Sequence, residues 1–254
     1  MSLFLPSSAS DTTRREFPAE SRDDIFRQLP GLRKRYPNYK SFANSTIDSI
    51  FPLQQRKGAI ELEANYFSSA LIKNEGKSRF TITPLPKQAQ ISVLNGMVVN
   101  DFDEDGNLDV LVNGNDFGTE PILGRYDALN GLLLRGDGKG NFIPLSTLQS
   151  GIFIGGDGKA LVQFRNKSNK LLIAASQNKG PLKIFELNKD TKMIPLNPMD
   201  ETVIIYFKDG RKQKREVGYG SSFLSQSGRF ITVGDNVKSV QITNNKGQKR
   251  SVDP

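Results

Sequence analysis

The sequence predicts a mainly β chain of short antiparallel strands that follows a helical N-terminal segment. Two observations support this fold class. From about residue 59, short apolar runs such as 69–72, 80–82 and 97–99 alternate with turns rich in Gly, Asn and Asp, a spacing typical of antiparallel all-β folds. Before residue 59, the apolar residues recur at helical spacing instead. The 254 residues are enough to bury a substantial core.

Residues 1–57 are expected to form an N-terminal extension with two short helices. Ser21 is a suitable N-cap for the first helix, and two aspartates follow it in the first turn, where carboxylates favour the helix dipole. Pro30 ends this helix. A second helix is expected from about Ser41 to Ile50, because the apolar residues of this stretch fall on one helical face.

Two pairs of segments in the β region are similar at the same spacing along the chain. Residues 71–80 align with residues 133–142, and each copy reads as a strand, a Gly-containing turn and a second strand that closes on Phe. Residues 98–103 align with residues 160–165 at the same offset. A repeat unit of this size with several strands is typical of a β-propeller blade. We therefore expect a partial β-propeller of about two to three blades in residues 58–195.

A propeller needs at least about four blades to close, so residues 58–195 cannot close one. We expect the open edges to be covered by the remaining propeller blades, by a partner chain, or by the helices and the C-terminal segment. The Pro- and Asn-containing stretch 195–200 is interpreted as a linker. Residues 196–254 then form a small C-terminal β domain.

The composition excludes several kinds of chemistry. The chain has no His and no Cys. Zinc sites built on these residues, Ser-His-Asp triads, Cys nucleophiles and disulfides are therefore all impossible. The sequence also lacks an apolar run of the roughly 18–20 residues needed to span a bilayer. Any metal site in this chain must use oxygen ligands.

The net charge of +8 is unevenly distributed. Residues 1–57 carry a net charge of +4, residues 58–200 carry −1, and residues 201–254 carry +5. A basic surplus suits nucleic acid or an anionic surface. The C-terminal cations have no aromatic residues among them for base stacking, so nucleic-acid binding is disfavoured and a solvated hairpin tip is expected. These cations are Lys208, Arg211, Lys212, Lys214, Arg215, Lys249 and Arg250.

An acidic loop is the most specific chemical signal in the sequence. Residues 101–109 read Asp-Phe-Asp-Glu-Asp-Gly-Asn-Leu-Asp, with acids at positions 1, 3, 5 and 9 and a Gly that permits a sharp turn. Carboxylates that converge repel one another by about 1 kcal/mol per pair at 4 Å in water. A hard dication relieves this repulsion, and Ca²⁺ takes roughly six to eight oxygen ligands. We predict one structural Ca²⁺ held by Asp101, Asp103, Asp105, the carbonyl of Asn107 and Asp109.

The loop differs from an EF-hand, because position 12 is Val112 rather than Glu and the flanking segments read as strands. Mg²⁺ suits the loop less well than Ca²⁺, because it demands a near-ideal octahedron and retains waters. Glu104 is expected to point into solvent. In the second repeat, cations and an amide replace the acids, and we hypothesise that fixed positive charge takes the place of the metal there. These residues are Gln163, Arg165, Lys167 and Lys170.

Residues 101–109, followed by Asn-Asp-Phe-Gly at 115–118, resemble the FG-GAP/VCBS repeat, the calcium-loop blade also found in integrin α-subunit propellers. Residues 134–142 are similar to the outer hairpin of such a blade. Residues 218–227 and 237–242 are similar to the ASPIC/UnbV domain, which often follows such repeats. The chain departs from that domain at residues 230–235, where family members usually carry Gly-Leu-Gly.

The resemblance implies an exported protein of Bacteroidetes type, located in the periplasm, on the outer-membrane surface or outside the cell. It implies structural calcium but no reaction, because a fold alone does not determine activity. We therefore expect a non-catalytic binding or scaffold module for adhesion or for a glycan or protein ligand. The alternative is a carboxylate-based glycan-processing enzyme, or its accessory domain. The candidate acids for that activity are Asp116, Glu120 and Asp127.

Overall fold

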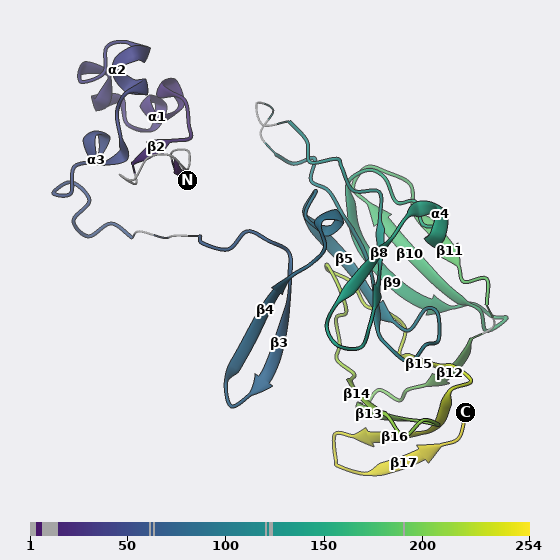
Figure 1. Ribbon diagram of the computed structural model, residues 1–254. Coiled ribbons are helices and arrows are strands. Elements are labelled where there is room, and N and C mark those ends of the chain that lie inside the picture. Colours follow the sequence, from purple (N-terminus) through teal and green to yellow (C-terminus); the bar gives the residue numbers. More distant parts are fainter. Residues whose placement is uncertain are drawn as a thin grey trace. The chain divides into compact units, whose positions relative to one another are not determined.

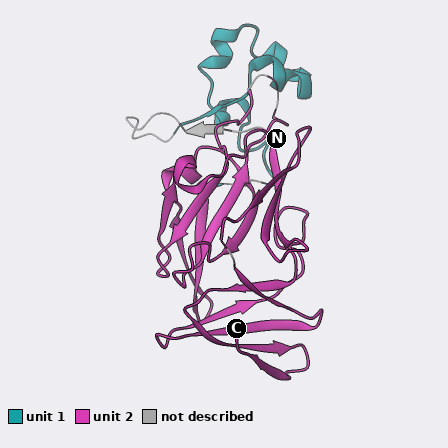
Figure 2. Ribbon diagram, turned by 90° about the vertical axis from the view of Figure 1, so that its right-hand side faces the viewer, with its two compact units in different colours: residues 1–65 teal, residues 66–254 magenta. Residues whose placement is uncertain are grey.

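The computed structural model describes residues 4–6, 15–60, 62, 64–119, 121, 124–189 and 191–254. These residues are mainly β, which confirms the predicted β-rich character, and they form several small antiparallel sheets with no closed barrel among them (Figure 1). The chain divides into two compact units, residues 1–65 and residues 66–254 (Figure 2). No helix in the described part of the chain is long and apolar enough to cross a membrane.

The first unit contains more helical elements than the sequence predicted. Two short strands, β1 and β2, pair near its start. Ser21 caps the first helix as expected, because its side chain accepts a hydrogen bond from the backbone N–H of Asp24. The described helices and strands of this unit are β1 (Phe4–Pro6), β2 (Glu16–Pro18), α1 (Arg22–Gln28), a 3-10 helix η1 (Pro30–Lys34), α2 (Tyr39–Ala43) and α3 (Ile47–Ile50).

The prediction of a single second helix was wrong, because α2 and α3 are separate. Helix α2 ends before Asn44, and Thr46 begins α3 as an N-cap whose side chain accepts from the N–H of Ser49. Asn, Ser and Thr side chains compete with the helix for backbone hydrogen bonds and therefore favour caps. Arg35, which follows the 3-10 helix, donates to the carbonyls of Ser49 and Ile50 and so connects that helix to α3.

An aromatic cluster forms the core of the first unit. The rings of Phe26 and Tyr36 each meet Phe42 edge to face, with centroids 5.7 and 5.9 Å apart respectively. Ile25 and Ile50 complete the buried set. The helices are short, so this tertiary packing rather than helix propensity stabilises them.

The second unit begins with a two-stranded hairpin, β3 (Ala70–Gly76) and β4 (Arg79–Pro84), and a 3-10 turn η2 (Lys87–Ala89). Ile72 lies opposite Ile82 in the register, and Phe80 is on the same face. These three side chains are 63%, 51% and 60% exposed. The opposite face carries Leu71, which lies beside Gly140 of the next sheet. One face of the hairpin is therefore apolar and uncovered by the described residues.

Two sheets follow in chain order, one of four strands and one of three. Their first strands, β5 and β9, pack against each other, and Val98, Leu111, Leu161 and Ile173 are buried between the sheets. A single helical turn, α4 (Thr147–Ser150), lies between them in the sequence. The strands are β5 (Leu94–Asn100), β6 (Asp109–Gly114), β7 (Leu132–Gly136) and β8 (Phe142–Leu145), then β9 (Gly158–Arg165), β10 (Leu171–Gln177) and β11 (Lys183–Glu186).

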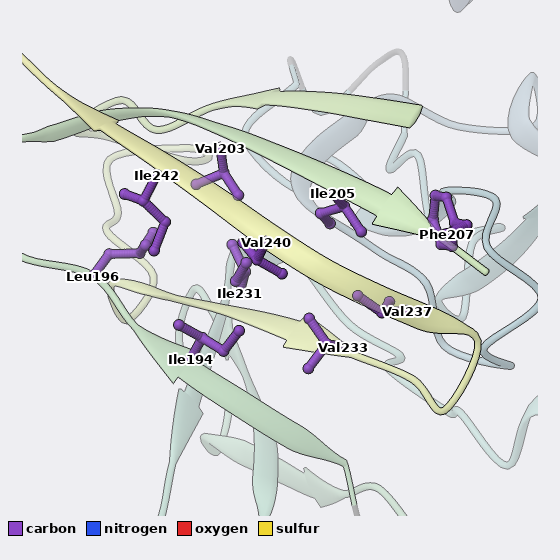
Figure 3. Close-up of a cluster of buried hydrophobic side chains, with 10 residues drawn as sticks. All are labelled: Ile194, Leu196, Val203, Ile205, Phe207, Ile231, Val233, Val237, Val240 and Ile242. Atoms are coloured by element: carbon purple, nitrogen blue, oxygen red, sulfur yellow. The ribbon is translucent and has the colours of Figure 1, made fainter. Parts of the chain in front are cut away.

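Two further small sheets face each other across the largest apolar cluster (Figure 3). The side chains of β13 and β16 point toward those of β12 and β15. One sheet has the order β14-β13-β16-β17, and the other is the pair β12-β15. The strands are β12 (Lys192–Pro195), β13 (Asp200–Phe207), β14 (Lys212–Glu216), β15 (Phe230–Val233), β16 (Val237–Asn244) and β17 (Lys249–Val252).

The stretch 195–200, interpreted from the sequence as a linker, belongs to this packed region. Pro195 is the last residue of β12, Leu196 is buried in the cluster, and Asp200 begins β13. Strand β12 pairs with β15 although the two are more than 30 residues apart in sequence. The C-terminal packing therefore starts before residue 196 and lies in the same compact unit as the preceding sheets.

An ion pair between a buried aspartate and a partly exposed arginine joins the start of β13 to β17. Both carboxylate oxygens of Asp200 accept from Arg250, each at 2.6 Å, and the Asp200 side chain is 1% exposed. The hydrogen bonds from Arg250 hold the pKa of Asp200 below its usual value, against the opposing effect of burial. A carboxylate with a lowered pKa contributes stability above its unfolded-state pKa, and this contribution is lost as the pH falls through the folded-state pKa.

We expect Asp200→Asn to lower the free energy of unfolding at pH 7 by about 1–3 kcal/mol, a range discounted for the partly exposed arginine. The difference from the natural protein should begin to shrink below about pH 4, where Asp200 becomes protonated in the unfolded state, and it should be lost as the pH falls through the lowered folded-state pKa. Urea unfolding at pH 7 and pH 3.5 measures both quantities. Glu201→Gln, at an exposed neighbour, is the control. A difference that does not depend on pH would contradict the ion-pair explanation.

Candidate metal centre

The acidic loop joins β5 to β6. It follows Asn100, the last residue of β5, and ends at Asp109, the first residue of β6, and these two residues are paired in the sheet. Its turn requires a left-handed backbone at Glu104, with φ of 62°, and at Gly106, with φ of 88°. Glycine adopts this conformation without steric cost. Side-chain oxygens then wrap the chain inward, because Asp101 Oδ2 accepts from the N–H of Gly106 at 2.9 Å and Asp103 Oδ1 accepts from the N–H of Asp105 at 3.3 Å.

Three of the predicted ligands converge. Asp101, Asp103 and Asp109 each offer a carboxylate oxygen, and these three oxygens lie within 4.8 Å of one another. Oδ1 of Asp101 is buried and has no hydrogen-bond partner among the described residues. A buried, unpartnered carboxylate oxygen is costly unless something compensates it. The residues present therefore fit a hard cation, although an all-oxygen set does not by itself select Ca²⁺.

Asp109 also has a structural function. It is 2% exposed, and its Oδ2 accepts from the N–H of Phe102 while its Oδ1 accepts from the N–H of Gly136, both at 2.9 Å. Phe102 belongs to the loop and Gly136 ends β7. This one carboxylate therefore ties the acidic loop to the third strand of the sheet.

The other two predicted ligands are placed differently. The carboxylate of Asp105 turns to Asn107, accepting from its backbone N–H at 2.7 Å and from its side-chain amide at 3.0 Å, and it is not part of the convergent set. The side-chain oxygen of Asn107 accepts from Arg211. Coordination by Asp105 and by the Asn107 carbonyl stays a prediction.

The loop concentrates negative charge where water is partly excluded. Burial raises the pKa of Asp101 to about 6, and the neighbouring carboxylates of Asp105, Asp109 and Asp103 add to the rise, against the stabilising N–H of Gly106. Burial also raises the pKa of Asp109. Both shifts mean that the backbone hydrogen bonds to these carboxylates compensate their charged forms only in part. A bound cation would supply that compensation.

Donors from the C-terminal sheets hold the outer side of the loop, a feature that the sequence reasoning missed. Nδ2 of Asn236 donates to the Glu104 carbonyl at 3.0 Å, and Nη2 of Arg211 donates to the Asp105 carbonyl at 3.1 Å. Nε2 of Gln213 donates to the Gly106 carbonyl at 3.4 Å. The uneven distribution of charge along the sequence could have indicated this contact, because the acidic loop and the basic segment 201–254 have complementary charges.

Charged side chains also meet at this contact. The expectation that Glu104 points into solvent was wrong, because its carboxylate pairs with Lys189 at 2.7 Å and its side chain is 15% exposed. Arg215 is half buried, and its burial lowers its pKa to about 10, while the charge of Asp101 acts in the opposite direction. Two of the cations expected at a solvated hairpin tip, Arg211 and Arg215, thus interact with carbonyls or acids of this chain, and Arg250, another of the C-terminal cations, pairs with Asp200.

The acids considered for glycan chemistry are engaged in local contacts. Asp116 Oδ1 accepts from the N–H of Gly118 at 2.8 Å, and Asp127 Oδ1 accepts from the side-chain amide of Asn115 at 3.4 Å. Glu120 lies outside the described residues. Asp116 also forms a β-bridge with Tyr126. These contacts give Asp116 and Asp127 a local structural function in this loop.

Comparison with protein-family models finds no match to this chain, and neither does comparison with curated proteins. The likeness to FG-GAP/VCBS repeats and to the ASPIC/UnbV domain thus rests on the sequence motifs alone.

Proposed function

We propose that residues 101–109 bind one structural Ca²⁺ and that the chain is a non-catalytic, calcium-stabilised binding or scaffold module of an exported or cell-surface protein. The observation that carries the proposal is the convergence of three carboxylates around a buried Asp101 oxygen without a partner. Asp101, Asp103 and Asp109 would hold the ion. Its contribution would be to neutralise their charge and fix the turn between β5 and β6.

The arrangement of the sheets supports a partial propeller as the scaffold. The sheets β5–β8 and β9–β11 follow one another in chain order and contact through their first strands, as successive blades do. Hairpin β3–β4 leaves an apolar face exposed beside them. We propose that another blade, from the same protein or from a partner chain, covers this face, and that the module then presents a glycan or protein ligand site.

Calcium should raise the melting temperature by about 5–10 °C at a concentration 100 times the Kd, because a ligand that binds only the folded state stabilises it. Asp103→Asn should abolish this rise. Asp103 is exposed, and among the described residues its side chain accepts one hydrogen bond, at 3.3 Å from the N–H of Asp105. Its replacement should therefore leave the stability in chelator within about 0.5 kcal/mol of the natural value. Differential scanning calorimetry with calcium and with chelator measures both effects.

Glu201→Gln removes one exposed negative charge elsewhere in the same unit and is the matched control, which should keep the full calcium response. Calorimetric titration should give one ion per chain. A stoichiometry of two, or an unchanged melting temperature with excess calcium, would count against the proposal.

A further inference from the structure

We propose that Arg211, Gln213 and Asn236 are positioning residues for the metal loop, so that calcium binding and the attachment of the C-terminal sheets strengthen each other. This inference rests on the proposed function, because it assumes that the loop binds calcium. The C-terminal sheets would then influence the calcium affinity of the loop, although the carboxylates that bind the ion all belong to residues 101–109.

The contacts between the C-terminal sheets and the loop follow a regular pattern. The three donors take the carbonyls of three successive residues, Glu104, Asp105 and Gly106. These carbonyls belong to the turn that separates Asp103 from Asp109. Fixing three successive peptide groups fixes the backbone on which the converging carboxylates are carried. The donors come from positions more than 100 residues away in the sequence, so the turn is held by tertiary structure.

The loop and the C-terminal sheets approach each other closely at two glycines, Gly106 and Gly234. A methyl group added at Gly106 would lie 2.7 Å from Nη2 of Arg211, 3.2 Å from Nδ2 of Asn236 and 3.2 Å from Cε1 of Phe207. A methyl group added at Gly234 would lie 2.9 Å from Cβ of Glu104. The end of the Arg211 side chain can shift, but Cβ of Glu104 is fixed to the backbone, so the loop and the C-terminal sheets are in close contact at Gly234.

The contact also extends from the loop to strands β5 and β15. The hydroxyl of Thr232 in β15 donates to the side-chain oxygen of Asn100, the last residue of β5. Both residues are buried, at 5% and 1% exposure. The loop is thus bracketed by Asn236 and Arg211 at its tip and by Thr232 at its base. Coupling between two sites is reciprocal, so a sheet that raises calcium affinity must be held more firmly by calcium.

The positive charge of Arg211 lowers the calcium affinity of the loop, because it repels a second cation, whereas the hydrogen bond from Arg211 to the loop raises that affinity. Asp209 balances much of that charge, since its carboxylate receives the Nε of Arg211 at 2.7 Å. Asn236 is uncharged and therefore isolates positioning from electrostatics. Asn236→Ala is the principal variant, and Arg211→Lys, which keeps the charge but loses the forked donor, is the second.

The experiment measures the calcium Kd of the full chain by calorimetric titration. Asn236→Ala and Arg211→Lys should each weaken calcium binding by about tenfold, in the range of measured coupling between sites. Asn245→Ala, an exposed asparagine beyond β16, should bind calcium as the natural chain does. If Asn236→Ala does not fold in chelator, Arg211→Lys alone decides the question.

Amide hydrogen exchange gives a second readout that does not depend on substitutions. Calcium should slow exchange at least tenfold in residues 206–216 and 230–237 of the natural chain. Calcium binding by the natural chain, with unchanged affinity in both variants and unchanged exchange in these segments, would overturn the inference and leave the proposed function standing. Absence of calcium binding by the natural chain would overturn both.

Discussion

Asp109→Ala is expected to destabilise the second unit by about 2–5 kcal/mol even in the presence of a chelator. The carboxylate is buried and accepts the N–H groups of Phe102 and Gly136. Alanine would leave both buried donors without partners, at a cost of about 1–3 kcal/mol for each. Domains of ordinary stability have about 5–15 kcal/mol in total, so this one substitution removes a large fraction. It should also abolish calcium binding.

Comparison of two aspartates separates structure from metal binding. Asp103→Asn should remove only the calcium response, whereas Asp109→Ala should also lower the urea midpoint in chelator. Asp109→Asn should be intermediate, because an amide keeps one acceptor oxygen but directs an NH₂ group toward an N–H donor. A loss of less than about 1 kcal/mol for Asp109→Ala in chelator would contradict the hydrogen-bonding function of this carboxylate.

Local features of this chain were predictable where neighbouring residues determine them. Ser21 caps α1 because its oxygen reaches the N–H three residues later. The acidic loop forms between two strands because Gly106 permits the turn and Asp101, five residues earlier, accepts its backbone N–H. The mainly β character followed from the spacing of the apolar runs. None of these conclusions needs information about distant parts of the chain.

Features that depend on distant contacts were missed. Glu104 looks like a solvated acid in sequence, yet Lys189 lies 85 residues away along the chain and 2.7 Å away in space. Pro195 and Leu196 look like a linker, yet β12 pairs with β15 and buries Leu196. Arg211 lies in the predicted hairpin turn, between β13 and β14, but the contacts of its donors with the acidic loop were not predicted. Local sequence sets propensity, and tertiary pairing decides the outcome in each of these cases.

A methyl group at position 96 is expected to be among the most damaging small changes in the chain. Gly96 lies in β5 where its backbone approaches β9, and an added Cβ would meet the Lys159 carbonyl oxygen at 2.6 Å, the Leu161 nitrogen at 2.7 Å and Oδ1 of Asn113 at 2.4 Å. Two of these atoms are backbone and cannot rotate away. Asn113 is fully buried and already accepts the N–H of Gly96 at 2.8 Å, so it has little freedom to move.

Gly96→Ala should therefore force β5 and β9 apart, at a cost of about 3 kcal/mol, which lowers the melting temperature by about 6–12 °C in a unit of this size. Thermal unfolding measures the shift. Gly218→Ala is the matched control, because a Cβ there meets no heavy atom within 4 Å and its φ is not positive; it should be neutral or slightly stabilising. If the two variants melted together, the first strands of the two sheets could not be packed backbone to backbone, and their interpretation as successive blades would lose its main structural support.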